Sequence, residues 1–126
     1  MIYKKSSGTQ GAWLDKKTLE TGMSAVIVSE IEPMEREYQG KPQIQDVGKV
    51  RVEGNEQAEN FAFNRTTING LIEAFGEENT DWCNKELKVQ VENAVINNKR
   101  VRIVYLIPEG YELKENEDGY LGITKA

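Results

Sequence analysis

The sequence predicts one mainly β domain with a single helix. Short runs rich in β-branched and aromatic residues recur along the chain, separated by Gly, Pro and Asn, as strands joined by turns require. Residues 68–75 alone change to the period of a helix. At 126 residues, with 29% charged and 38% hydrophobic side chains, the chain can bury a core without disulfides or metal.

The first strand is predicted from the run MSAVIVSEI, residues 23–31, which follows Gly22 and is rich in β-branched side chains. Pro33 is expected to end it, because proline interrupts a strand that is paired on both sides. Residues 34–42 are polar and contain Gly40. They predict a long connection with a hairpin tip.

The next two strands complete a meander. Residues 44–53 alternate valines with basic side chains, which is the period of a half-buried strand. Gly54 begins a turn, and residues 58–63 predict a third strand. Phe61 and Phe63 share one face of it, and we expect both in the core because Phe is among the residues most often buried.

A helix of about ten residues follows, a length typical of globular proteins. Its apolar positions recur at i, i+3, i+4 and i+7, and they are Ile68, Leu71, Ile72 and Phe75. The candidate caps are Asn64, Thr66 or Thr67 at the start and Gly76 at the end. Leu87, Val89 and Val91 then alternate as a fourth strand, and residues 101–107 predict a fifth that ends at Pro108.

Strand, strand, strand, helix, strand, strand is the element order of the OB-fold, a five-stranded Greek-key barrel with an α-helix between strands 3 and 4. A small α+β sheet covered by one helix has the same order. We expect the barrel domain to span residues 13–108. A flexible N-terminal lead, residues 1–12, would precede it, and an acidic, mobile C-terminal tail, residues 109–126, would follow.

Residues 63–89, FNRTTINGLIEAFGEENTDWCNKELKV, resemble a pattern found in small phage and archaeal proteins. In that pattern a strand ends in Asn, a helix closes in Phe-Gly or Tyr-Gly, and an acidic loop, a Trp and Gly-Lys precede an alternating strand. Asn84 stands here where the pattern has Gly. The resemblance implies the junction between the helix and the fourth strand of a small OB-like protein, a class often suspected of binding single-stranded DNA.

Catalytic and metal chemistry have little support. The chain has no histidine to activate Cys83, its single cysteine, and a zinc site would have to be all carboxylate. The sequence contains no Walker loop, GxSxG or GxGxxG motif. The carboxylates within residues 30–35 and 77–81 fit no calcium-loop spacing. We therefore expect a protein that is not an enzyme and that has no cofactor or metal.

Net charge argues against a protein that coats duplex DNA, since the chain carries -5. The distribution is uneven: residues 85–105 hold five basic and two acidic side chains, whereas residues 106–126 hold two and five. No apolar run approaches the roughly 20 residues that cross a bilayer, and the first residues lack the apolar segment of a signal peptide. The expected location is cytoplasmic.

OB-folds generally bind ligands across strands 2 and 3 and the loops joining strands 1 to 2 and 4 to 5. On that surface, basic side chains could contact phosphates and a tyrosine could stack on bases. The alternative is that these charges are merely solvated. The candidate nucleic-acid-binding residues are Arg36, Tyr38, Lys41, Lys49, Arg51, Lys88, Lys99, Arg100 and Arg102. Trp13 and Trp82 are expected to cover barrel ends.

The sequence thus favours a non-catalytic protein that binds single-stranded nucleic acid, DNA more than RNA, with little sequence preference. A protein–protein interaction or assembly module built on the same barrel is the alternative. Such a module would dock a protein partner or a second copy of the chain, and the net negative charge fits it.

Overall fold

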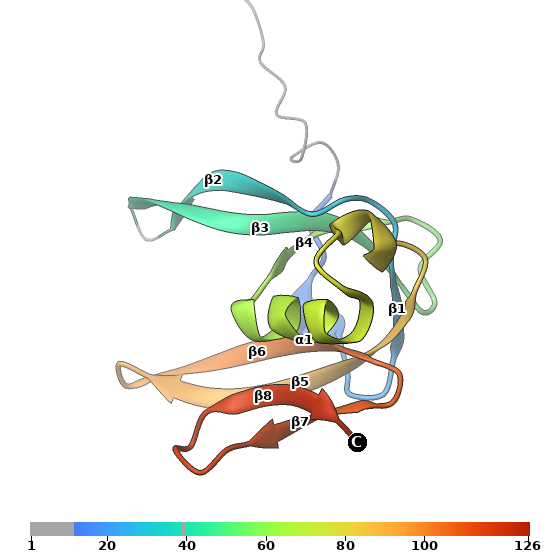
Figure 1. Ribbon diagram of the computed structural model, residues 1–126. Helices are drawn as coiled ribbons and strands as arrows, with labels where there is room; N and C mark the ends of the chain where they lie inside the picture. The colour runs from blue at the N-terminus through green and yellow to red at the C-terminus, as the bar shows by residue number, and fades with distance from the viewer. Residues whose placement is uncertain (1–11, 39) are drawn as a thin grey trace, which may run out of the picture.

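The computed structural model describes residues 12–38 and 40–126, except for the side chain of Tyr38. A mainly β fold with one α-helix is confirmed (Figure 1). Two 3-10 turns, η1 (Lys16–Thr18) and η2 (Asn79–Trp82), accompany the regular elements. These are β1 (Ser24–Ile27), β2 (Glu32–Tyr38), β3 (Lys41–Val52), β4 (Glu59–Phe63), α1 (Arg65–Phe75), β5 (Glu86–Ile96), β6 (Lys99–Pro108), β7 (Tyr111–Glu115) and β8 (Leu121–Lys125).

The larger sheet is antiparallel and runs β2-β3-β1-β5-β6, with β4 also paired to β3. Strands β2 and β4 both pair with Asp46 and Val47, so they lie on opposite edges of β3. Strands β1 and β4 both pair with Val50, so β1 shares its edge with β2. No ladder joins β4 to β6 in the described residues, and the described strands do not close into a barrel.

The first predicted strand is corrected in its extent. The chain breaks after β1, resumes as β2, and places Pro33 inside β2 opposite Asp46. Proline is tolerated there because β2 lies at the edge of the sheet. At the break, the Ser29 Oγ accepts a hydrogen bond of 2.8 Å from the backbone N–H of Lys49. Residues 34–38 belong to β2 and 41–42 to β3 of one hairpin, and Gly40 between these strands has a φ of 79°.

The predicted helix is confirmed, together with its caps. The Asn64 Oδ1 accepts from the backbone N–H of Thr67 at 2.8 Å, which satisfies one of the free donors of the first turn. Gly76 ends the helix with a φ of 95°. The Asn64 side chain also donates to the Val104 carbonyl at 2.9 Å, so one residue caps α1 and holds it to β6.

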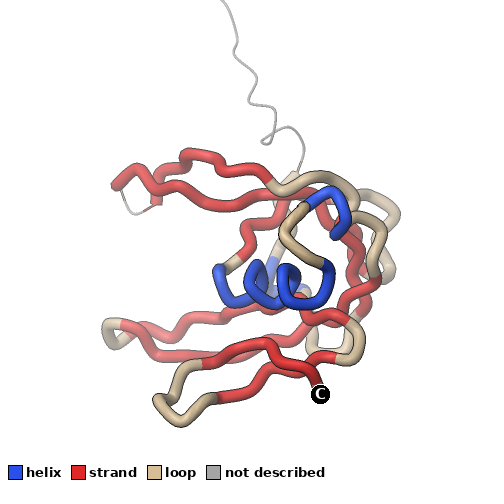
Figure 2. Tube along the Cα trace, viewed as in Figure 1, coloured by secondary structure: helices blue, strands red, loops and turns tan. Residues whose placement is uncertain are grey.

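The main core lies where α1 packs against the sheet (Figure 2). Phe61 and Phe63 are buried in it, as predicted, with their rings edge to face at 4.9 Å. Trp82 is also buried, and its indole N–H donates to the Gly76 carbonyl at 2.8 Å. No helix in the described part of the chain has the length and apolar character to span a bilayer.

Residues 109–126 do not form the expected tail, because β7 and β8 pair there as a hairpin. A second apolar cluster, which contains Tyr105, Ile107 and Ile123, packs the hairpin on the face of β6 opposite the main core. Consecutive residues of β6 are therefore buried on both faces. The acidic composition concealed the hairpin because its carboxylates lie on the exposed positions of β7, while Tyr111 and Leu113 alternate between them as half-buried residues.

A segment before the first strand connects two strands that do not pair with each other. Of the lead, residues 1–11 lie outside the described residues, but Ala12 and Leu14 bond the backbone of Asn60 in β4, each at 2.9 Å. Leu19 is buried, and its carbonyl accepts a hydrogen bond from the Arg102 guanidinium of β6. Residues 12–19 thus bridge β4 and β6.

We expect Asn64→Ala to lower the free energy of unfolding by about 2–3 kcal/mol, because it removes an N-cap and leaves the Val104 carbonyl without its donor. Urea denaturation followed by circular dichroism measures this loss. Asn69→Ala, an exposed site on the same helix, is the matched control and should change stability by less than about 0.5 kcal/mol. Equal effects of the two changes would contradict the role given to Asn64.

Gly70 is the point where β8 meets α1. A Cβ at this position would lie 2.8 Å from the Ile123 Cβ and 2.9 Å from its Cγ2. We expect Gly70→Ala to destabilise the protein, because overpacking costs about 1–3 kcal/mol and offsets the gain of roughly 1 kcal/mol in helix propensity. Hydrogen exchange should show faster-exchanging amides in the β7–β8 hairpin. Gly122→Ala, which meets no heavy atom within 4 Å, should leave that hairpin protected.

Candidate nucleic-acid interface

Two long hairpins, β2–β3 and β5–β6, extend in the same direction on either side of α1 (Figures 1 and 2). They enclose a cleft of about 410 Å³, which we call the arm cleft. Its walls are residues 43–46 of β3, 62–63 of β4, 64–65 at the start of α1, 102–104 of β6, and Lys16 of η1.

The cleft exists because β4 is short. Strand β4 ends at Phe63, where Asn64 starts the helix, so the ladder between β3 and β4 stops at Asp46. Residues 41–45 of β3 therefore pair with β2 alone, and β6 pairs with β5 alone. Two strand edges without a ladder partner in the described residues border the cleft, although side chains of Asn64 and Thr67 bond the β6 edge at Val104 and Leu106.

The lining of the arm cleft is basic. It contains Lys16, Arg65 and Arg102 but a single carboxylate, that of Asp46. Arg65 is the first residue of α1, where the helix dipole also contributes positive potential. The hydrogen bond to the Leu19 carbonyl positions Arg102. A protein with a net charge of -5 thus concentrates cations in one cleft, which would attract an anionic ligand.

The pKa of Lys16 shows that Arg36, a cation outside the lining, also contributes to this potential. Burial lowers the pKa of Lys16 below its usual value, and the neighbouring positive charge of Arg36 lowers it further. The Lys16 ammonium also lies 5.3 Å from the centre of the Phe61 ring, at a distance suited to a cation–π contact. Arg36 therefore acts electrostatically on the cleft although it does not line it.

Arg36 stacks on Trp13 beside the arm cleft. The guanidinium carbon lies 3.9 Å from the centre of the indole ring. The Arg36 Nη1 donates to the Gln45 Oε1 at 2.9 Å, and Gln45 is itself a residue of the cleft wall. Sequence reasoning missed this pair. A parallel bridge between Trp13 and Asn60 brings the indole to Arg36, and a bridge between residues so far apart in the chain leaves no pattern in the local sequence.

The structure brings part of the predicted site together. Arg102 lines the arm cleft, and Arg36 adjoins it. Lys41 is exposed near the turn of the β2–β3 arm, and Lys99 and Arg100 are exposed near the turn of the β5–β6 arm. Tyr38 ends β2, but its side chain lies outside the described residues.

Three other predicted residues lie elsewhere, next to carboxylates. Lys49 shares a hollow of about 260 Å³ with Glu30 and Glu32. Arg51 lines another hollow, which also contains Glu53 and Glu86. Lys88 donates to the Ser24 hydroxyl at 3.2 Å, and that hydroxyl in turn contacts Glu86 at 3.1 Å. The structure therefore separates Lys49, Arg51 and Lys88 from the arm cleft.

Lys16 and Arg65 are cleft residues that sequence reasoning did not select. One signal was available for Arg65, since a cation in the first turn of a helix opposes the usual preference for acidic residues there. Lys16 had no such signal, because it precedes the first predicted strand and reaches the cleft only through the bridging segment.

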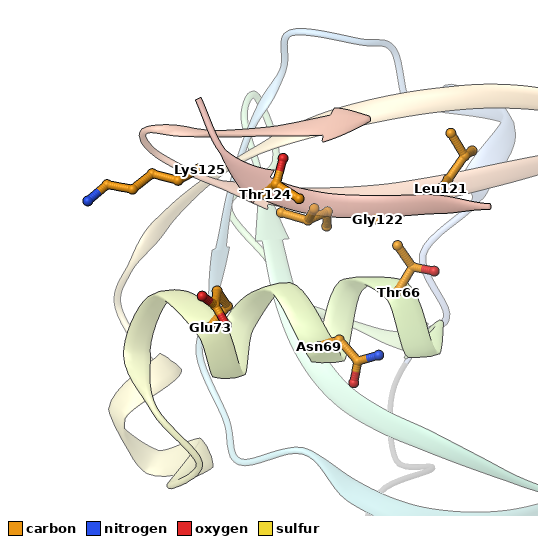
Figure 3. A pocket seen from close by; sticks show the side chains of 8 residues that line it. Thr66, Asn69, Glu73, Leu121, Gly122, Thr124 and Lys125 are labelled. Atoms are coloured by element: carbon orange, nitrogen blue, oxygen red, sulfur yellow. The ribbon is translucent and has the colours of Figure 1, made fainter. Parts of the chain in front are cut away.

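A further hollow of about 390 Å³ lies between α1 and β8 (Figure 3). Glu73 and Lys125 are its charged residues, and Lys125 extends away from the helix in Figure 3. This hollow lies where β8 packs on α1, and its lining contains one acidic and one basic side chain. It therefore lacks the excess of cations that distinguishes the arm cleft.

Cys83 is half-buried, and burial together with the charge of Glu30 raises the pKa of its thiol. A raised pKa keeps the thiol protonated and weakens it as a nucleophile. In the described part of the chain, no three Asp, Glu or Cys side chains gather as a metal site would require.

Comparison with protein-family models, with curated proteins and with solved structures finds no match to this chain.

The pKa of Lys16 should rise when Arg36 is replaced by Gln, because a neighbouring positive charge disfavours the protonated form of a lysine. It should remain below the ordinary lysine value, since burial is the larger cause of the depression. An NMR titration of the Lys16 side-chain resonances measures the change. Arg51→Gln is the matched control and should leave the titration unchanged. An unchanged pKa in Arg36→Gln would show that the two charges do not interact.

Proposed function

We propose that this protein is a non-catalytic single-stranded nucleic-acid-binding protein and that its ligand occupies the arm cleft. The observation that carries the proposal is the gathering of Lys16, Arg65 and Arg102 around one carboxylate in a chain of net negative charge. Phosphates are the repeated anions of nucleic acid, and contacts to them supply much of the binding energy without reading sequence.

We also propose an OB-type arrangement for the larger sheet. In this interpretation β1 and β2 are one bent first strand, since both lie on the same edge of β3. Strands β3, β4, β5 and β6 are then strands 2 to 5, and α1 stands between strands 3 and 4. Residues 12–19 bridge the seam between β4 and β6 in place of a ladder.

In the OB interpretation, the position of the arm cleft can be compared with the ligand-binding surface of OB proteins. The β2–β3 turn becomes the loop between strands 1 and 2, and the β5–β6 turn becomes the loop between strands 4 and 5. OB proteins bind oligonucleotides between these loops, across strands 2 and 3. The arm cleft lies between the two hairpins and includes residues of β3 and β4, which supports the proposal that it is the ligand site.

The proposed ligand is single-stranded DNA in preference to RNA, and the protein binds it with little sequence preference. The preference for DNA follows from the resemblance of residues 63–89 to small OB-like proteins. Low sequence preference follows from the chemistry of the cleft, because its charged groups are suited to phosphates and every base offers a face for stacking.

A protein-interaction module is the second candidate, and a specific feature supports it. Ile44 on one arm is 66% exposed, and Val95 and Ile96 on the other are 69% and 52% exposed. An extended segment of a partner could pair with the edge of β3 or β6 and cover these side chains. Such a complex would need no basic cleft, so the charge distribution favours nucleic acid.

The test is fluorescence anisotropy of a labelled oligo-dT of about 30 nucleotides, long enough for several OB sites, with the parent and a Lys16→Ala/Arg65→Ala/Arg102→Ala variant. We expect the variant to bind at least about tenfold more weakly. Its slope of log K against log salt should fall by about 2, because each lost phosphate contact on a single strand contributes about 0.7.

Arg51→Ala/Lys88→Ala is the matched control, since it removes exposed cations outside the arm cleft. It should bind within about twofold of the parent, and circular dichroism should show that every variant is folded. Equal binding by the triple variant would refute the cleft assignment. Failure of the parent to bind at low salt would refute the function and favour the protein-interaction module.

A further inference from the structure

We propose that Trp13 and Arg36 form the base-stacking platform of the arm cleft, with a nucleobase lying against this pair while the cleft cations hold the phosphates. The inference rests on the proposed function and names the groups that contact the bases. It replaces Tyr38, the aromatic residue that the sequence favoured, with a tryptophan outside the predicted ligand-binding strands and loops.

Trp13 is held in place by backbone hydrogen bonds. Its two neighbours bond to Asn60 of β4 at 2.9 Å each, one through the Ala12 carbonyl and the other through the Leu14 N–H. A parallel bridge of this kind fixes the backbone of Trp13 and hence the direction in which its side chain leaves the strand. The indole is thus supported by the sheet although it precedes the first strand.

Arg36 is held on two sides. Its guanidinium carbon lies 3.9 Å from the centre of the indole, and Nη1 donates to Gln45 at 2.9 Å. Nucleobases stack on guanidinium planes as well as on aromatic rings. Because both groups are already ordered, binding of a base costs no further side-chain entropy to immobilise them.

Trp13 is less enclosed than Trp82, Phe61 and Phe63. Trp82, Phe61 and Phe63 are buried members of the main core, whereas Trp13 belongs to neither apolar cluster and is only half-buried. One group that it meets is a cation, the Arg36 guanidinium.

The pair also lies within reach of the phosphate-binding groups. Gln45 contacts Arg36 and lines the arm cleft, and the charge of Arg36 lowers the pKa of Lys16 in the cleft wall. A strand that follows the cleft cations would therefore pass this stack. Cations along the backbone beside an aromatic surface are the combination that sequence-tolerant single-strand binders use.

The first experiment uses tryptophan fluorescence, because the chain contains only Trp13 and Trp82. We expect oligo-dT to quench the parent at the concentrations at which anisotropy reports binding. Trp82→Phe, which leaves Trp13 as the single tryptophan, should retain the quenching. Trp13→Phe, which leaves only the buried Trp82, should abolish it. Quenching that persists in Trp13→Phe would overturn the proposal.

The second experiment measures affinity. Trp13→Ala should weaken oligo-dT binding by about 5- to 150-fold, the equivalent of 1–3 kcal/mol for a stacked base. Trp13→Phe should recover part of the loss, since it restores a smaller ring. Arg36→Lys keeps the charge but removes the planar group, so it should also weaken binding. Circular dichroism melting checks that each variant folds. If Trp13→Ala does not fold, the affinity of Trp13→Phe and the fluorescence quenching test the proposal instead.

Failure of this inference is distinguishable from failure of the proposed function. If the parent binds oligo-dT but Trp13→Ala binds equally well and the fluorescence of Trp13 does not respond, the platform is wrong and the basic cleft still binds the strand. If the parent does not bind at all, the function itself is wrong, and the stack of Trp13 and Arg36 is a structural contact.

Discussion

The side chain of Asn64 is the constraint on which the rest of the structure depends. Its carbonyl oxygen caps α1, and its amide nitrogen holds the start of that helix against Val104 of β6. By starting the helix at this point, Asn64 also ends β4 and stops the ladder on β3. A cap that satisfies one helical donor therefore leaves two strand edges without a ladder and places a cleft between them.

Strands β4 and β6 do not pair with each other in the described residues, and other segments connect them. Residues 12–19 bond β4 through their backbone and receive Arg102 from β6 through the Leu19 carbonyl. On the opposite face of β6, the β7–β8 hairpin covers Tyr105 and Ile107. Segments outside the predicted strands thus cover two surfaces of β6, and the bridging segment also places Lys16 in the arm cleft and Trp13 beside it.

The proposed chemistry divides between two neighbouring surfaces. The arm cleft supplies cations for phosphates, and the stack of Trp13 and Arg36 beside it supplies planar groups for bases. Gln45 joins the two, because it lines the cleft and accepts from Arg36. The net charge of -5, which argues against a protein that coats duplex DNA, matters less than this local arrangement. Screening limits the influence of distant carboxylates to about 10 Å at ordinary ionic strength.

The sequence by itself determined local elements: the helix, with Asn64 and Gly76 among its candidate caps, the strand before it and the two after it, and the burial of Phe61 and Phe63. These follow from periodicity and capping, which act between residues close in the chain. Only the tertiary structure decided which cations share a cleft. Lys16 and Arg102 meet through the bridging segment, while Lys49 and Arg51 point elsewhere. Long-range pairing sets that grouping, and alternation along one strand carries no information about it.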